Sequence, residues 1–205
     1  MAMSAKHLTL LVVGYDEANM RRFDLTHCGA AETHLVINYR NVGLATLGNW
    51  FFDWAIAAKS DVFGICHADS YFGPGALDKF CEIAAEGAVC GLVGFSLAAI
   101  QEEHKGYVWS RLNPQPVDTL DSASCFFPVS SGLRFDSQTF DGFHCHVEDL
   151  CLQAHAKGMP VVVPPADASH GGGPNQNWLD QWHADYRGYK AKLLAKWPNV
   201  RFGTT

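Results

Sequence analysis

The sequence predicts an α/β fold, in which helices cover both faces of an open, mixed and mostly parallel sheet. Apolar runs alternate along the chain with segments of helical periodicity. The runs are continuous, which is typical of strands buried on both faces. The chain has 205 residues of which 48% are apolar, enough for one sizeable core. In such sheets, ligands bind beyond the carboxyl ends of the strands.

In the first half of the chain, strands are expected at 7–14, 34–38 and 61–67, and helices at 44–58 and 74–86. The first helix is indicated by apolar residues at a 3.6-residue spacing, namely Leu44, Leu47, Phe51, Trp54 and Ala58. The second has Pro74 in its first turn and Gly87 just beyond its end, both typical positions.

The second half continues the alternation. Strands are expected at 88–96, 123–129 and 159–163, and a helix at 146–157 that Gly158 ends. A final helix can begin at Asn177 as its N-cap, and Pro198 ends it.

Charge and cysteine usage exclude several classes of protein. With 15 Lys and Arg against 21 Asp and Glu, the net charge is −6, which argues against a nucleic-acid binder. The chain shows neither a signal-peptide pattern nor an apolar stretch long enough to span a membrane. Seven cysteines without a CxxC motif predict reduced thiols in the core of a cytoplasmic protein.

Two segments carry residues that could hold a metal ion, one at a strand end and one in a later loop. His67 and Asp69 lie one residue apart at the end of the strand expected at 61–67. Carboxylate oxygen suits hard divalent cations, and Mn²⁺ also accepts imidazole. His170 precedes three glycines, which would allow close approach to a ligand. The structural alternatives are a turn aspartate and a solvated loop histidine.

Two further groups stand near expected helix starts. Asn41, Gly43 and Asn49 surround the start of the helix at 44–58, where simple capping is the alternative. Glu148 and Asp149 fall in the first turn of the helix at 146–157. The helix dipole favours anions there, so they could be ordinary helix-start acids or a general base in a cleft.

Taken in order, these segments resemble the inverting, family-2-like nucleotide-sugar glycosyltransferases of the GT-A fold, from about residue 35 to 173. Asn41-x-Gly43 and Asn49 are similar to that family's donor-binding segment, and His67-Ala68-Asp69 stands in the place of its Asp-x-Asp motif. Glu148-Asp149 looks like its catalytic-base motif, and His170 like its late histidine.

The resemblance implies a single glycosyltransferase-like domain over 1–205 with a helical tail at 176–197. Asp69, His67 and His170 would hold Mn²⁺ or Mg²⁺. Asn41, Gly43 and Asn49 would orient a nucleotide-diphosphate sugar, with UDP-sugars the first donors to consider. The resemblance also implies that Asp16 lies near the nucleotide base, that Asp149 is the general base, and that Glu148 is its supporting neighbour.

The acceptor would be a saccharide or a lipid-linked hydroxyl compound. The tail carries basic residues that could touch a membrane surface, although a solvated helix face is the simpler interpretation: Arg187, Lys190, Lys192, Lys196 and Arg201.

Two other functions remain open from the sequence. His67 in place of the first Asp, and the lack of an acidic turn between Tyr15 and Asn38, would also fit a non-catalytic protein that binds a sugar nucleotide or a partner. His144, His146 and Asp149 could instead form the site of a metal-dependent hydrolase. His144-Cys145-His146 also has a spacing compatible with structural zinc.

Overall fold

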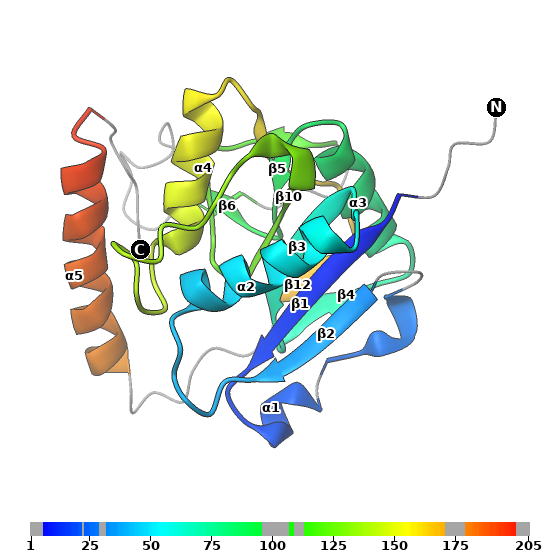
Figure 1. Cartoon of the computed structure of the whole chain (residues 1–205), viewed down its shortest axis with the longest axis horizontal. Coiled ribbons are helices and arrows are strands. Elements are labelled where there is room, and N and C mark those ends of the chain that lie inside the picture. Colours follow the sequence, from blue (N-terminus) through cyan, green and yellow to red (C-terminus); the bar gives the residue numbers. More distant parts are fainter. Residues whose placement is uncertain are drawn as a thin grey trace.

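The computed structural model describes residues 6–21, 23–28, 32–95, 107–108, 113–170 and 179–199. Its centre is a seven-stranded sheet in the order β2-β1-β3-β10-β5-β11-β8 (Figure 1). The strands are β1 (Leu8–Gly14), β2 (Glu32–Ile37), β3 (Val62–His67), β5 (Val89–Cys90), β8 (Gln115–Pro116), β10 (Ser124–Pro128) and β11 (Val161–Val163). β10 and β8 run antiparallel to their neighbours, and the other pairs are parallel. The predicted fold class is confirmed.

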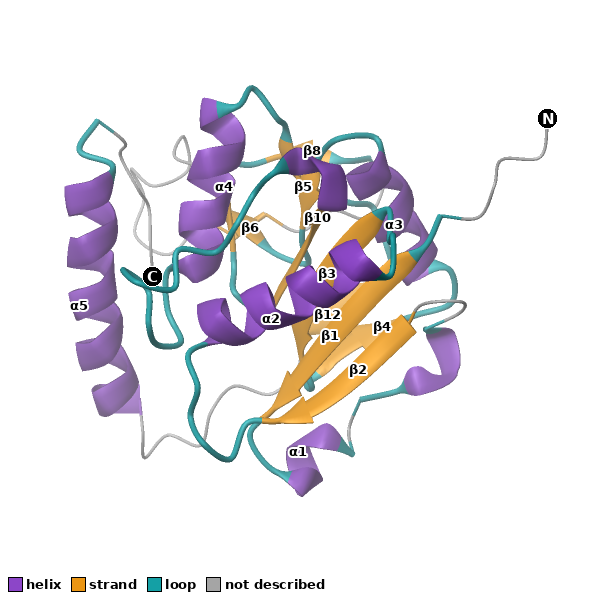
Figure 2. Ribbon diagram, in the orientation of Figure 1, coloured by secondary structure: helices purple, strands orange, loops and turns teal. Residues whose placement is uncertain are grey.

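The helices cover both faces of this sheet, as Figure 2 shows. Alternate residues of β1 point to opposite faces, so Leu11 and Val13 join one core cluster and Leu10 and Val12 the other. The first cluster includes residues of α2 and α4, and the second those of α1 and α3. The helices are α1 (Glu17–Met20), α2 (Leu44–Ala57), α3 (Ala76–Ala85), α4 (His146–Ala156) and α5 (Leu179–Lys196), with 3-10 turns at Leu25–His27 and Val129–Ser131.

The predicted strand at 88–96 is wrong in its length, because the chain leaves the central sheet after β5. A Cβ on Gly91 would lie 2.5 Å from the carbonyl oxygen of Ser124, so only glycine allows this approach. The backbone N–H of Leu92 then donates to Ser124 Oγ at 2.9 Å. The chain continues as β6 (Gly94–Phe95) in a separate sheet with β7 (Tyr107–Val108) and β9 (Thr119–Leu120).

A second small sheet was not predicted. β4 (Ser70–Phe72) pairs antiparallel with β12 (Ala168–His170), and His170 is the register partner of Ser70. This pairing joins two segments that are about 100 residues apart in the sequence, and it brings β12 beside the end of β3.

The C-terminal helix α5 packs outside α4 (Figure 1). A third core cluster holds it there, formed by Phe140, Cys145, Leu152, Tyr186 and Leu193. The predicted N-cap, Asn177, and the start of the tail at 176 lie outside the described residues. None of the described helices has the length and apolar character needed to cross a membrane.

The seven cysteines are all buried and no disulfide joins them, so their predicted core positions are confirmed. Burial raises the pKa of Cys66, Cys90 and Cys125 well above the ordinary value of a thiol. These thiols therefore act as small apolar side chains.

Candidate functional site

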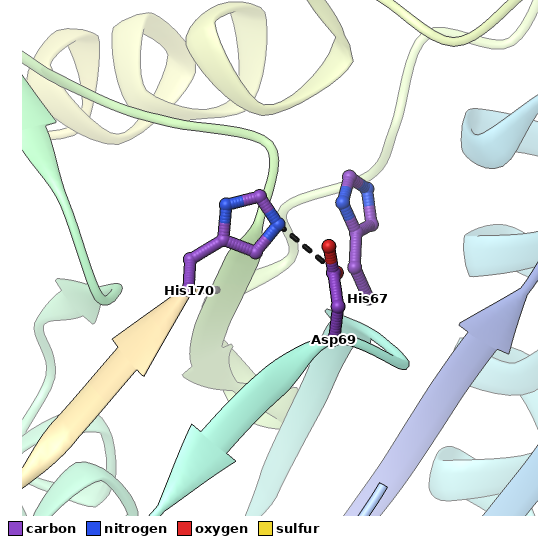
Figure 3. Close-up of side chains that lie close together, drawn as sticks. All are labelled: His67, Asp69 and His170. Atoms are coloured by element: carbon purple, nitrogen blue, oxygen red, sulfur yellow. Dashed lines mark ion pairs between the residues drawn. The ribbon is translucent and has the colours of Figure 1, made fainter. Parts of the chain in front are cut away.

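Three side chains converge at the carboxyl end of β3. His67 is the last residue of β3, Asp69 lies in the turn to β4, and His170 ends β12 (Figure 3). The Nε2 atom of His170 lies 3.0 Å from Oδ1 of Asp69. One ligand atom from each residue lies within 4.8 Å of the other two. All three residues were predicted from the sequence, and the β4–β12 pairing explains how His170 reaches the others.

Each of the two histidines has one ring nitrogen that makes no hydrogen bond to the described part of the protein. The Nε2 atoms of His67 and His170 are buried, and in the described part of the chain neither has a partner with hydrogen-bond geometry. The contact from His170 to Asp69 is thus an ion-pair contact rather than a well-aimed hydrogen bond. A buried polar atom without a protein partner costs free energy, and an ordered water, an ion or a ligand would satisfy it.

The charges of the cluster are coupled. Burial would raise the pKa of Asp69, but the close contact with His170 outweighs it and holds that pKa below its ordinary value. Burial would lower the pKa of His170, but Asp69 raises it. The pKa of His67 is lowered, by burial first and by His170 second. Asp69 is therefore ionised and His67 is neutral near pH 7, which are the forms that bind metal ions.

These residues fit a divalent metal ion. They supply one carboxylate and two imidazoles around a common point, and Asp69 and His170 keep 18% and 32% of their side-chain surface exposed. Among the described residues, this is the one group of three His, Cys, Asp or Glu side chains with such geometry.

Asp121 lies close enough to influence both histidines, and it was not predicted from the sequence. Its Oδ1 accepts from the backbone N–H of Ala123 at 2.7 Å. Its charge raises the pKa of both His67 and His170. The only sequence signal was an acid that precedes the small-residue start of β10, a position that also suits a turn.

The two adjacent acids of α4 lie in different environments. Asp149 is fully buried, and its carboxylate contacts three donor side chains. Trp197 Nε1 donates to Oδ1 at 2.7 Å, Lys196 Nζ lies 2.8 Å from the same oxygen, and Gln153 Nε2 donates to Oδ2 at 2.8 Å. The structure therefore ties Asp149 to α5 and not to the metal-capable cluster, whereas the resemblance placed it at the substrate.

Glu148 carries the free acid oxygen. Its Oε2 atom is buried, and no partner for it is found among the described residues. Burial raises its pKa to about 8, and the charges of Asp121 and Asp149 act in the same direction. A carboxyl group with a pKa near neutrality can exchange a proton near neutral pH, so the pKa of Glu148 suits acid–base chemistry.

The predicted donor-binding residues have structural partners. Asn49 Nδ2 donates to the carbonyl of Phe135 at 2.8 Å, and its Oδ1 accepts from the N–H of Phe135 at 3.1 Å. Asp16 is the N-cap of α1 and accepts from Asn19 N–H at 2.7 Å. Neither side chain is brought to the metal-capable cluster.

Asn41 and Gly43 shape the loop before α2. Asn41 is exposed and has φ 50°, in the left-handed region. A Cβ on Gly43 would collide with the carbonyl oxygen of Asp141, at 2.1 Å, and Leu44 N–H donates to the carbonyl of Gly142. The loop is thus fixed against the segment that leads into α4.

The residues of the hydrolase and zinc alternatives do not form a metal-capable group within the described structure. His146 is fully buried, with both ring nitrogens unpartnered within the described ranges, and burial lowers its pKa to about 3. Asp149 is held by α5 as described. The basic tail is also partly neutralised, because Lys192 pairs with Asp141 and Lys196 with Asp136 and Asp149.

Comparison with known proteins adds evidence on the fold. No protein-family model matches the chain, and no curated protein sequence matches it. The crystal structure of A197 from STIV is similar, with a TM-score of 0.53 and 12% identity, over 82% of this chain and 86% of that one. At this identity the likeness shows a shared fold and nothing of activity.

Two other solved structures show weaker likeness. For mannose-1-phosphate geranyltransferase from Thermus thermophilus, the TM-score is 0.43 at 12% identity, over 80% of this chain and 76% of that one. For the inositol-1-phosphate CTP transferase from T. maritima it is 0.44 at 13% identity, over 93% and 97%. The function must therefore be argued from the site.

Proposed function

We propose that this protein is a metal-dependent glycosyltransferase that moves a sugar from a nucleotide-diphosphate sugar to an acceptor hydroxyl with inversion. The observation that carries the proposal is the convergence of His67, Asp69 and His170, with the buried Nε2 of His67 lacking a hydrogen-bond partner among the described residues, at the carboxyl end of a central strand. That edge is where open α/β sheets bind their ligands. The motif order described above supplies the donor class, with UDP-sugars the first to test.

Asp69, His170 and His67 are the residues that would hold Mn²⁺ or Mg²⁺. A bound divalent ion supplies positive charge that stabilises the diphosphate as it leaves. The protein's part is to fix the three ligand atoms through the β4–β12 pairing and to keep Asp69 ionised. The cleft then presents the donor to the acceptor in one orientation.

Glu148 is the group that accepts the proton. Its free Oε2 takes the proton from the acceptor hydroxyl, and the hydroxyl oxygen forms a bond to the anomeric carbon. The bond from that carbon to the diphosphate oxygen breaks, and attack from the opposite side inverts the centre. Asp149 takes a different role: it anchors α5 and so holds the first turn of α4 in place.

Thermal unfolding in the presence of UDP tests the binding part of the proposal. A ligand that binds only the folded state raises the Tm, so UDP with Mn²⁺ should raise it for the parent protein. Asp69→Asn should abolish that rise, because the amide removes the anionic ligand. The matched control is Asp53→Asn, a surface carboxylate paired with Arg134, which should keep it. Equal shifts for parent and Asp69→Asn would contradict the metal assignment.

The burial of Asp149 favours one second candidate, a protein of the same fold that binds a sugar nucleotide without turnover. The two functions separate on Glu148. Hydrolysis of UDP-sugars with Mn²⁺, lost in Glu148→Gln at unchanged UDP affinity, supports the transferase. Binding of UDP-sugars without turnover by the parent, across a panel of donors and saccharide acceptors, supports the second candidate.

A further inference from the structure

We infer that the His67–Asp69–His170 site selects a transition-metal ion over Mg²⁺ and that His67 is the residue that determines this selection. The inference rests on the metal site of the proposed function and adds to it the class of ion. Its first support is the set of ligand atoms: two imidazole nitrogens against a single carboxylate.

The chemistry of these ligands separates the ions. Mg²⁺ binds oxygen, keeps several waters, and demands near-ideal octahedral geometry. Imidazole nitrogen suits Fe²⁺, Co²⁺ and Zn²⁺, and Mn²⁺ also accepts it; for a given site of nitrogen and oxygen ligands, Mn²⁺ binds more weakly than these later ions. For Mg²⁺ the site offers one anionic oxygen ligand, whereas a transition-metal ion can use all three side chains.

His67 is held in a position to act as a ligand. It ends β3, where β1 lies on one side and β10 on the other. Its ring packs at centroid distances of 6.4 Å from Tyr15 and 5.6 Å from His170. Its Nε2 is buried and unpartnered in the described structure, so it has already lost its water without a protein partner in return. A bound ion would recover that cost, and an ion with little affinity for nitrogen would not.

Neighbouring oxygen atoms do not replace the missing carboxylate. Asp121 is near enough to influence both histidines, but Oδ1 is occupied by the Ala123 N–H and the residue lies outside the 4.8 Å group. Ser70 Oγ donates to the carbonyl of Ala123 at 3.2 Å. His67 therefore stands where a carboxylate would make the site suitable for Mg²⁺.

Calorimetric titration of the metal-free protein with Mn²⁺, Zn²⁺ or Mg²⁺ alone tests the inference without any assay of transfer. The parent should bind Mn²⁺ and Zn²⁺ about tenfold or more tightly than Mg²⁺. His67→Asp should reduce the ratio of Zn²⁺ affinity to Mg²⁺ affinity, because it strengthens the binding of Mg²⁺ and weakens the binding of Zn²⁺. His155→Asp makes the same change at an exposed helix position whose Nε2 contacts the carbonyl of Asp118, and it should leave the ratio unchanged.

Two further measurements keep the inference testable if His67→Asp does not fold. The ratio of Mn²⁺ affinity to Mg²⁺ affinity can be measured on the parent protein alone. Pulsed electron paramagnetic resonance of the Mn²⁺ complex should show directly bound imidazole nitrogen. Mg²⁺ binding as tight as Mn²⁺, or Mn²⁺ without bound nitrogen, would overturn the inference. Binding of no ion by the parent would overturn the metal site itself. Selective binding of ions without any binding of UDP would leave the inference standing and remove the proposed function.

Discussion

Two clusters of buried charge lie on this protein, and they differ in whether their polar atoms have partners. At the end of β3, the histidines beside Asp69 have buried nitrogens without hydrogen-bond partners in the described residues. At the junction of α4 and α5, the carboxylate of Asp149 accepts from Trp197, Lys196 and Gln153. The first cluster keeps part of its surface exposed and the second is fully buried at Asp149, and the second has the hydrogen bonds that make burial of a charge tolerable.

The difference separates function from folding. A buried charge whose hydrogen bonds are all made holds elements together, whereas a buried polar group without a partner costs free energy unless a ligand binds it. By this criterion Asp149 is part of the fold, and Glu148, whose Oε2 has no described partner, is the acid of the pair left for the proposed chemistry. Adjacent helix residues point about 100° apart, so one acid can face the cleft while the next faces α5.

The largest effect is expected from Lys196→Met, which leaves Asp149 buried without its cation. Removal of one partner of a buried ion pair typically costs ~3–5 kcal/mol, and we expect about 3 because Trp197 and Gln153 still donate. Urea unfolding measures it. Lys192→Met removes an exposed pair with Asp141 and should cost at most about 1 kcal/mol.

A double variant makes this test specific. Lys196→Met combined with Asp149→Leu should recover most of the lost stability, because no buried charge is left. If the double variant is less stable than Lys196→Met by the full cost of Asp149→Leu alone, the two residues are not coupled and the interpretation is wrong.

A smaller effect is expected from the titration of Glu148, whose pKa rises from 4.5 in the unfolded chain to about 8 in the fold. Between those values the folded state binds more protons than the unfolded state, so its contribution to stability is complete below pH 4.5 and is lost as the pH rises to 8. The parent should therefore lose stability through this group as the pH rises across that window. Glu148→Gln has no such titration, so its unfolding free energy should fall less between about pH 5 and pH 9.

The same titration sets the direction of the pH–rate profile. Glu148 must be ionised to accept a proton, so kcat/KM for transfer should rise with pH up to about 8. Parent and Glu148→Gln with parallel stability curves over the same pH range would show that Glu148 is not buried as a neutral acid.

Most of the fold was predictable because its signals are local. Continuous apolar runs and the 3.6-residue period gave β1, β3, α2, α3 and α4 to within about two residues. The pairing of β4 with β12 could not be predicted, because three-residue strands have no period and their contact spans about 100 residues. The turn of the chain at Gly91 depends on contact with Ser124, which no local pattern encodes.

For the site, the sequence predicted which residue types are present but not the environment in which each side chain lies. His67, Asp69 and His170 were identified because histidine and aspartate at a strand end have metal chemistry. The sequence could not show that Asp149 has buried partners, since these are Lys196 and Trp197 near the far end of the chain. Asparagine was the least informative residue type, because an amide satisfies a backbone as readily as a ligand.

The smallest effect concerns Asn49 and distinguishes its two roles. Its amide makes paired hydrogen bonds to the backbone of Phe135 at 2.8 and 3.1 Å. Asn49→Ala should therefore lower the unfolding free energy by about 1.5 kcal/mol, because it leaves both groups of Phe135 unpaired. Its UDP affinity with Mn²⁺ should stay within about twofold of the parent, since a structural hydrogen bond contributes little to binding. Asn41→Gly is the matched control: glycine accepts φ 50° without strain, so stability should hardly change. A stable Asn49→Ala protein that has lost UDP binding would contradict this expectation. It would show that Asn49 binds the donor rather than only holding the backbone of Phe135.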